Sequence, residues 1–141
     1  MKYSRSGNTY LVRIDRGEEI MEKVKELCEK EHIRLGRVEA IGAADRAMLG
    51  VYDLEKQEYF PEEIHEFMEI VSLNGNITAM EGKAYVHLHA ALADGRHQLH
   101  GGHVIELRVG ATCEMFITVP DGEVNRRKDR ELGINLWSFR E

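Results

Sequence analysis

Three of the seven histidines in this sequence have the spacing of a metal site. In the segment AYVHLHAALADGRHQLHGGHVIEL (residues 84–107), His87 and His89 lie two residues apart within a run typical of a β-strand. Side chains two apart on a strand point to the same face, about 6.6 Å from each other along the chain. The opposite face is apolar, and we expect it in the core: Val86, Leu88, Ala90 and Leu92.

A turn should bring the third histidine to this face. The Asp-Gly pair favours a five-residue loop at 94–98, and such a loop would place His89 opposite His103. Directly opposed residues have Cβ atoms about 4.5–5.5 Å apart, so the three imidazoles would converge on one patch of sheet. The glycine pair at 101–102 is typical of a bulge, which leaves this register open by one residue.

Three imidazoles around one point would bind a tetrahedral metal ion and leave its fourth position open. Imidazole suits zinc, nickel, copper or iron, and availability favours zinc. A zinc ion of this kind lowers the pKa of bound water to about 7, as hydrolases and lyases require. Catalysis would also need a nearby acid or base. No catalytic residue can be assigned, but composition offers four carboxylates: Glu39, Asp45, Glu69 and Glu106.

The other histidines set the alternatives to this site. A pattern of two histidines separated by one residue also arises by chance, and histidines on a sheet are often structural or exposed. His97 in the expected turn and His100 on the opposite face are the competing ligands. His32 and His65 lie in charged surroundings, so we expect them at the surface.

Composition limits the protein class. The chain has 141 residues, 43% hydrophobic and 31% charged, which is typical of a globular domain. Its net charge of −6 opposes binding to nucleic acid, where affinity comes from clustered Lys and Arg. We find neither an apolar signal segment near the start nor a run of about 20 apolar residues that could span a membrane. With only Cys28 and Cys113, both expected to be buried and free, a reduced cytoplasmic compartment is predicted.

One amphipathic helix is predicted after the first strand. Asp15 precedes Glu18 by three residues, the spacing of a capping box. The helix should end near Lys30. Its buried face follows helical spacing: Ile20, Val24, Leu27 and Cys28.

The remaining chain has the pattern of many short strands separated by turns. The motif AADR separates the second expected strand from the third, and NGN separates the fifth from the sixth. Residues 121–131 read as a mixed-charge loop. This pattern predicts an antiparallel α+β protein with a single domain over residues 1–141. The expected strands are 9–14, 37–43, 47–52, 58–60, 67–73, 77–80, 85–93, 103–109, 112–119 and 133–139.

Several motifs occur in an order that resembles the plants-and-prokaryotes-conserved (PPC) domain family, over about residues 10–117. They are GRVEAIGAADRAMLGVYD, MEIVSLNGNI, VHLHAALAD, GGHVIEL and ATCEMFI. The resemblance implies an antiparallel β-sheet with flanking helices, and a homotrimer associating through strand edges and apolar sheet surface such as MEIVSLNGNI. It also implies a metal held by histidines, which are His87, His89 and His103 here. The fold is further grouped with acetolactate decarboxylase, a zinc enzyme.

The resemblance also suggests DNA, since stand-alone family members are described as candidate DNA-binding proteins. In plant relatives, however, an Arg-Gly-Arg AT-hook enters the minor groove, and this chain contains no RGR. Its basic cluster is interleaved with acids: Arg126, Arg127 and Lys128, then Asp129, Arg130 and Glu131. Three functions stay open: a metal-binding homotrimer, a metal-dependent hydrolase or lyase, and a DNA-associated regulator.

Overall fold

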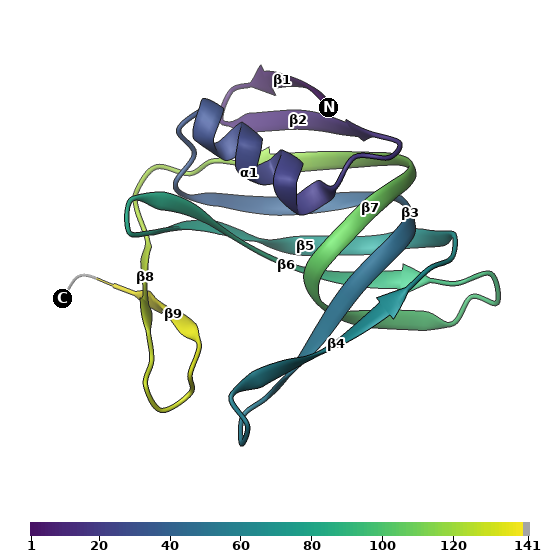
Figure 1. The fold of residues 1–141 in the computed structure, drawn as a ribbon. Helices are drawn as coiled ribbons and strands as arrows, with labels where there is room; N and C mark the ends of the chain where they lie inside the picture. Colours follow the sequence, from purple (N-terminus) through teal and green to yellow (C-terminus); the bar gives the residue numbers. More distant parts are fainter. Residues whose placement is uncertain (140–141) are drawn as a thin grey trace.

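Nine strands and one helix make up residues 1–139, the part of the chain that the structure, a computed structural model, describes (Figure 1). In chain order they are β1 (Lys2–Ser6), β2 (Thr9–Asp15), α1 (Ile20–Lys30), β3 (Gly36–Asp53), β4 (Glu58–Ile64), β5 (Met68–Met80), β6 (Lys83–Ala93), β7 (Leu99–Thr118), β8 (Asn125–Lys128) and β9 (Asn135–Ser138).

Four strands pair antiparallel in a closed cycle: β3 with β5, β5 with β6, β6 with the start of β7, and β7 with β3. The cycle closes because β3 and β7, of 18 and 20 residues, bend along their length (Figure 1). Register shifts between them mark the bends, as β-bulges do. At one shift, a Cβ on Gly42 would overlap the carbonyl oxygen of Thr112, so the close approach of the two strands requires glycine there.

The helix covers one side of this cycle, against β6 and β7, and the β1–β2 hairpin extends the sheet beyond β7 (Figure 1). Its predicted apolar face is buried. The predicted cap is wrong: Glu19, not Asp15, begins the helix, and its carboxylate accepts hydrogen bonds from the N–H groups of Met21 and Glu22. The carboxylate of Glu18 instead accepts a hydrogen bond from the N–H of Asp15 at 2.9 Å, in the turn that precedes the helix.

The α+β prediction therefore needs correction, because the described residues contain many strands and one short helix rather than flanking helices. Three predicted pairs of short strands are single long strands: β3, β5 and β7. AADR is a bulged part of β3, and NGN lies within β5. Sequence reasoning missed β1 and also β8, which lies in the expected mixed-charge loop. No helix within residues 1–139 is long and apolar enough to cross a membrane.

Candidate metal centre

The predicted convergence of the three histidines is present in the structure. The β6–β7 pairing sets Ala93 against Leu99 and His89 against His103, as the five-residue turn predicts. The rings of His87, His89 and His103 lie with centroids 5.0–5.5 Å apart. One potential ligand atom from each lies within 4.8 Å of the others. No other group of three or more potential ligands is found in the described residues.

The face of β6 opposite His87 and His89 packs in the hydrophobic core. All four apolar side chains expected in the core are buried there. The glycine pair at 101–102 does not form the expected bulge toward β6, where pairing is regular. A Cβ on Gly102 would lie 2.9 Å from the carbonyl oxygen of Gly50, so this glycine lets β3 pack closely beside His103.

The distances suit a metal ion. The Nε2 atoms of His87 and His89 are 3.2 Å apart. Two nitrogens bound to a tetrahedral zinc at 2.0–2.1 Å would be about 3.4 Å apart. The buried Nδ1 of His103 has no hydrogen-bond partner in the described residues, although buried polar atoms nearly always have one. A metal ion bound to this nitrogen would supply the missing partner.

The site also favours uncharged imidazoles. His87 and His103 are half-buried, whereas His89 is exposed. Burial, with the nearby charges of the other two histidines and Arg126, lowers the pKa of His87 from 6.5 to about 4. Burial and the charge of His89 also lower the pKa of His103. Rings with lowered pKa values are neutral at pH 7, which is the form that binds metal.

Aromatic and polar groups surround the cluster. Tyr59 of β4 stacks on His103, with ring centroids 4.7 Å apart and planes at 24°. Arg126 of β8 approaches Nδ1 of His87 at 3.5 Å. A cavity of about 230 Å³ adjoins His87 and His103; its other lining residues come from the β3–β4 and β8–β9 regions, with Tyr85 from β6.

Comparison with known proteins places this chain in a family. The model of the Plants and Prokaryotes Conserved (PCC) domain matches residues 1–120. The chain belongs to this family, abbreviated PPC below. No curated protein matches it significantly.

Solved structures agree over nearly the whole chain. A candidate DNA-binding protein from Bacteroides thetaiotaomicron has a TM-score of 0.95 at 27% identity, covering 98% of this chain and 96% of that one. The Metal-containing Protein from Archaeoglobus fulgidus has a TM-score of 0.87 at 35% identity, covering 99% and 100%. A plant- and prokaryote-conserved (PPC) protein from Pyrococcus horikoshii has a TM-score of 0.87 at 28% identity, covering 99% and 96%.

In this PPC protein the four carboxylates proposed as acids or bases lie away from the cavity. Glu39 pairs with Arg37 at 2.7 Å, and Asp45 with Arg108 at 2.7 Å. Glu106 lies 3.8 Å from Arg46, and Glu69 lines a different depression. The acid that does line the cavity is Glu58. Sequence reasoning missed it together with Tyr59 and Arg126, which lie far from the histidine motif in the sequence. It also missed Tyr85, although strand alternation puts Tyr85 on the same face as His87 and His89.

The remaining histidines and cysteines of the PPC chain lie outside the cluster. His97 is in the turn, with φ of 63°, and His100 contacts Asp94 at 3.1 Å. His32 and His65 are exposed, as predicted. Cys28 and Cys113 are free and buried, and burial raises the pKa of each thiol to about 12. Such thiols are poor metal ligands and nucleophiles.

Proposed function

We propose that this PPC protein binds one transition metal ion per chain through His87, His89 and His103, and that the ion is zinc. The observation that carries the proposal is the convergence of three imidazoles on one patch of sheet. The similar Archaeoglobus protein, described as metal-containing, supports it. The zinc assignment rests on ligand type and availability. When bound, the ion would act as a Lewis acid and activate water at its open position.

Elemental analysis of the purified protein tests this proposal. We expect close to one metal ion per chain in the wild type and a large loss in each of the variants His87→Ala, His89→Ala and His103→Ala. His97→Ala is the matched control, because this histidine lies in the turn of the same hairpin, and we expect it to retain its metal. Full metal content in all three ligand variants would refute the site.

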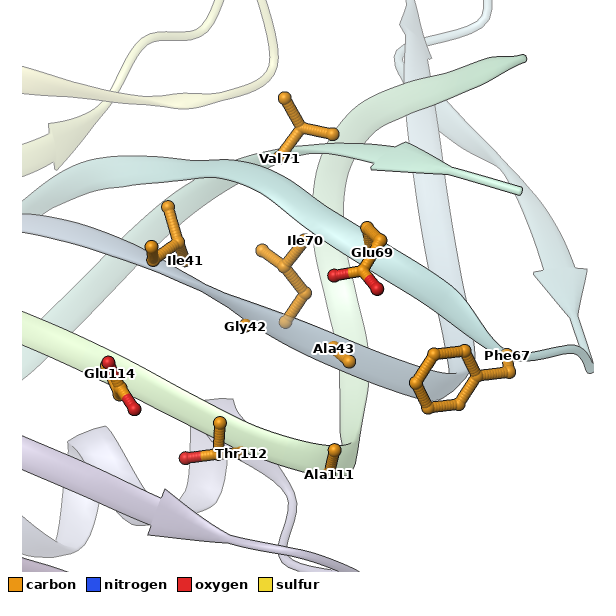
Figure 2. A pocket seen from close by; sticks show the side chains of 10 residues that line it. All are labelled: Ile41, Gly42, Ala43, Phe67, Glu69, Ile70, Val71, Ala111, Thr112 and Glu114. Carbon is orange, nitrogen blue, oxygen red and sulfur yellow. The ribbon is translucent and has the colours of Figure 1, made fainter. Parts of the chain in front are cut away.

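We also propose that the protein is a homotrimer that associates through the outer face of the sheet. Ile41, Val71 and Phe116 are 60%, 52% and 55% exposed on β3, β5 and β7. Ile41 and Val71 line a depression of about 460 Å³, and Figure 2 shows these two side chains on neighbouring strands. Both edges of β5 are already paired, so association through this segment would use its face rather than an edge.

Light scattering tests the assembly. At micromolar concentration we expect three times the chain mass of 16.2 kDa. Val71→Glu should dissociate the assembly, because it buries a charge at the contact. Glu114→Gln, at the rim of the same depression, is the control and should leave the mass unchanged. A wild-type mass of 16.2 kDa would refute the trimer.

A second candidate is a metal-dependent hydrolase or lyase acting on a small molecule. The cavity beside His87 and His103 favours it, because a purely structural metal site is usually closed. Burial raises the pKa of Tyr59, so its phenol stays protonated and can donate a hydrogen bond. Turnover of small esters, lactones or keto acids by the metal-loaded protein, lost in Tyr59→Phe, would favour this function. Turnover that is independent of metal loading would count against it.

A further inference from the structure

The cavity contains a positive charge that has no carboxylate partner. The guanidinium of Arg126 is half-buried, and every hydrogen bond it makes is to a neutral group. Its Nε donates to Oγ1 of Thr78 at 2.7 Å, its Nη1 to the carbonyl of Asn135 at 2.7 Å, and its Nη2 to Oδ1 of Asn76 at 2.8 Å. Its Cζ lies 4.5 Å from the ring centroid of Tyr85.

A charge removed from water is normally balanced by an opposite one. The two other half-buried arginines among residues 1–139 follow this rule, because Arg34 and Arg46 each reach a carboxylate within 4 Å. Arg126 has no such partner among residues 1–139, and Glu58, the acid of the cavity lining, is not within ion-pair distance of it. A metal ion bound by the neighbouring imidazoles would add positive charge. The field in the cavity therefore favours an anion.

We propose that this cavity is a binding site for a small molecule carrying an oxyanion, either carboxylate or phosphate, and that Arg126 is its main recognition residue. The proposal rests on the proposed metal site and extends it by naming the class of ligand. A volume of about 230 Å³ limits that ligand. It equals roughly seven or eight water molecules at about 30 Å³ each, so a molecule of metabolite size or less would fit.

Donors remain for such an anion. A guanidinium has five N–H groups. Three donate to Thr78, Asn135 and Asn76, and a fourth, on Nη2, faces Nδ1 of His87 at 3.5 Å, which leaves one N–H on Nη1 for the anion. The phenol oxygen of Tyr85 accepts a weak hydrogen bond from Asn135 at 3.4 Å, which leaves its own O–H free to donate. Tyr59 forms no hydrogen bond through its hydroxyl within the described part of the chain. Two phenols and a guanidinium are donors suited to an oxyanion.

The competing explanation for Arg126 is structural, because its bonds to Thr78 and Asn76 attach the β8–β9 hairpin to β5. Substituting Thr78 separates the two explanations. Thr78 is fully buried, so Thr78→Val keeps its shape while removing the contact with Nε of Arg126. This change weakens the attachment but leaves the cation in place.

Isothermal titration calorimetry of the full chain, with and without zinc, tests the proposal. The probes are acetate, pyruvate and inorganic phosphate, with acetamide as the uncharged match of acetate. Trp137, the one tryptophan, pairs with Arg126 across the hairpin and gives a second readout by fluorescence. We expect anions to bind and acetamide not to bind. Arg126→Gln should weaken anion binding about 10- to 100-fold while zinc content stays unchanged. Arg127→Gln, an exposed neighbour, and Thr78→Val should change it less than threefold.

The outcomes are distinguishable. Binding of either carboxylate or phosphate supports the proposal, and the probe that binds identifies the group. If the protein takes up no zinc but binds anions in an Arg126-dependent way, the metal site fails and the anion site stands. The anion site is overturned if zinc-loaded protein binds no anion, or binds acetamide equally well. It is also overturned if Arg126→Gln binds like the wild type, or if Thr78→Val loses as much affinity as Arg126→Gln.

Discussion

Replacing Gly75 by alanine should weaken metal binding, although this residue is not a ligand. Gly75 lies in the middle of β5 opposite Leu88, between the two histidines of β6. A Cβ at this position would overlap the carbonyl oxygen of His87 and lie 2.8 Å from Cδ2 of Leu88. The first obstacle is backbone, so no side-chain rotation can relieve it. Strand β6 must therefore move away from β5.

The size of the effect follows from this geometry. Ordinary contacts of a Cβ begin at 3.4 Å, so the two strands must separate by about an ångström or more around His87. Metal–ligand distances tolerate changes of only about 0.2 Å. We therefore expect metal affinity to fall about 10- to 100-fold, as for changes to groups that orient ligands. Overpacking should also destabilise the fold by about 1–3 kcal/mol, which lowers the melting temperature by roughly 3–12 °C.

Competition with a chromogenic zinc chelator gives the affinity, and calorimetry of the metal-free protein gives the stability. Gly95→Ala is the control, because a Cβ on Gly95, in the β6–β7 turn, would meet nothing within 4 Å. The control should match the wild type in both measurements. If Gly75→Ala binds zinc within threefold of the wild type and melts within about 1 °C of it, the argument from strand separation is wrong.

Three further predictions follow from other parts of the molecule. Glu19→Ala should destabilise the protein by about 1–2 kcal/mol in urea titrations, because the carboxylate caps α1 and also accepts the N–H of Leu107 at 2.9 Å; an effect no larger than that of exposed Lys25→Ala would contradict this. In the metal-free protein, NMR should show His87 titrating well below pH 6.5, near 4. On lowering the pH, His87 takes up a proton in the unfolded chain before it does so in the folded protein, so the free energy of unfolding should fall as the pH falls from 6.5 toward 4. A titration midpoint of His87 at pH 6.5 would be inconsistent with its burial. Duplex DNA should bind with a Kd of about 10⁻⁴ M or weaker in physiological salt, because the net charge of the chain is −6. A submicromolar Kd measured by fluorescence anisotropy, with a steep dependence on salt, would show that the assembled surface is basic.

The histidine part of the site could be predicted from the sequence because it depends on two local features of the chain. Strand alternation places His87 and His89 on one face, and the length of one turn places His103 opposite His89. Both operate over fewer than about twenty residues. Such reasoning found the register of this hairpin and the buried side of β6.

Gly75 shows where the same reasoning fails. Within NGN it has the composition of a turn, and the sequence analysis divides the strand there. In the structure it lies inside β5, where it permits close approach to the backbone of His87. Glycine serves both purposes for the same reason, the absence of a Cβ. Only the partner strand distinguishes them, and the partner is not encoded locally.

The other half of the site depends on contacts between distant segments. Tyr59 reaches His103 because β3 bends and brings β4 alongside, and Arg126 reaches His87 because the β8–β9 hairpin folds back over β5. The β3–β4 and β8–β9 regions also contact each other beside the cavity, where the hydroxyl of Tyr52 donates a hydrogen bond to the carbonyl of Leu132 at 2.8 Å. Residues that converge in this way have no shared periodicity. It follows that substitutions at Arg126 or Tyr59 should change which molecule enters the cavity while the metal stays bound, because the three metal ligands lie on a separate hairpin, β6–β7.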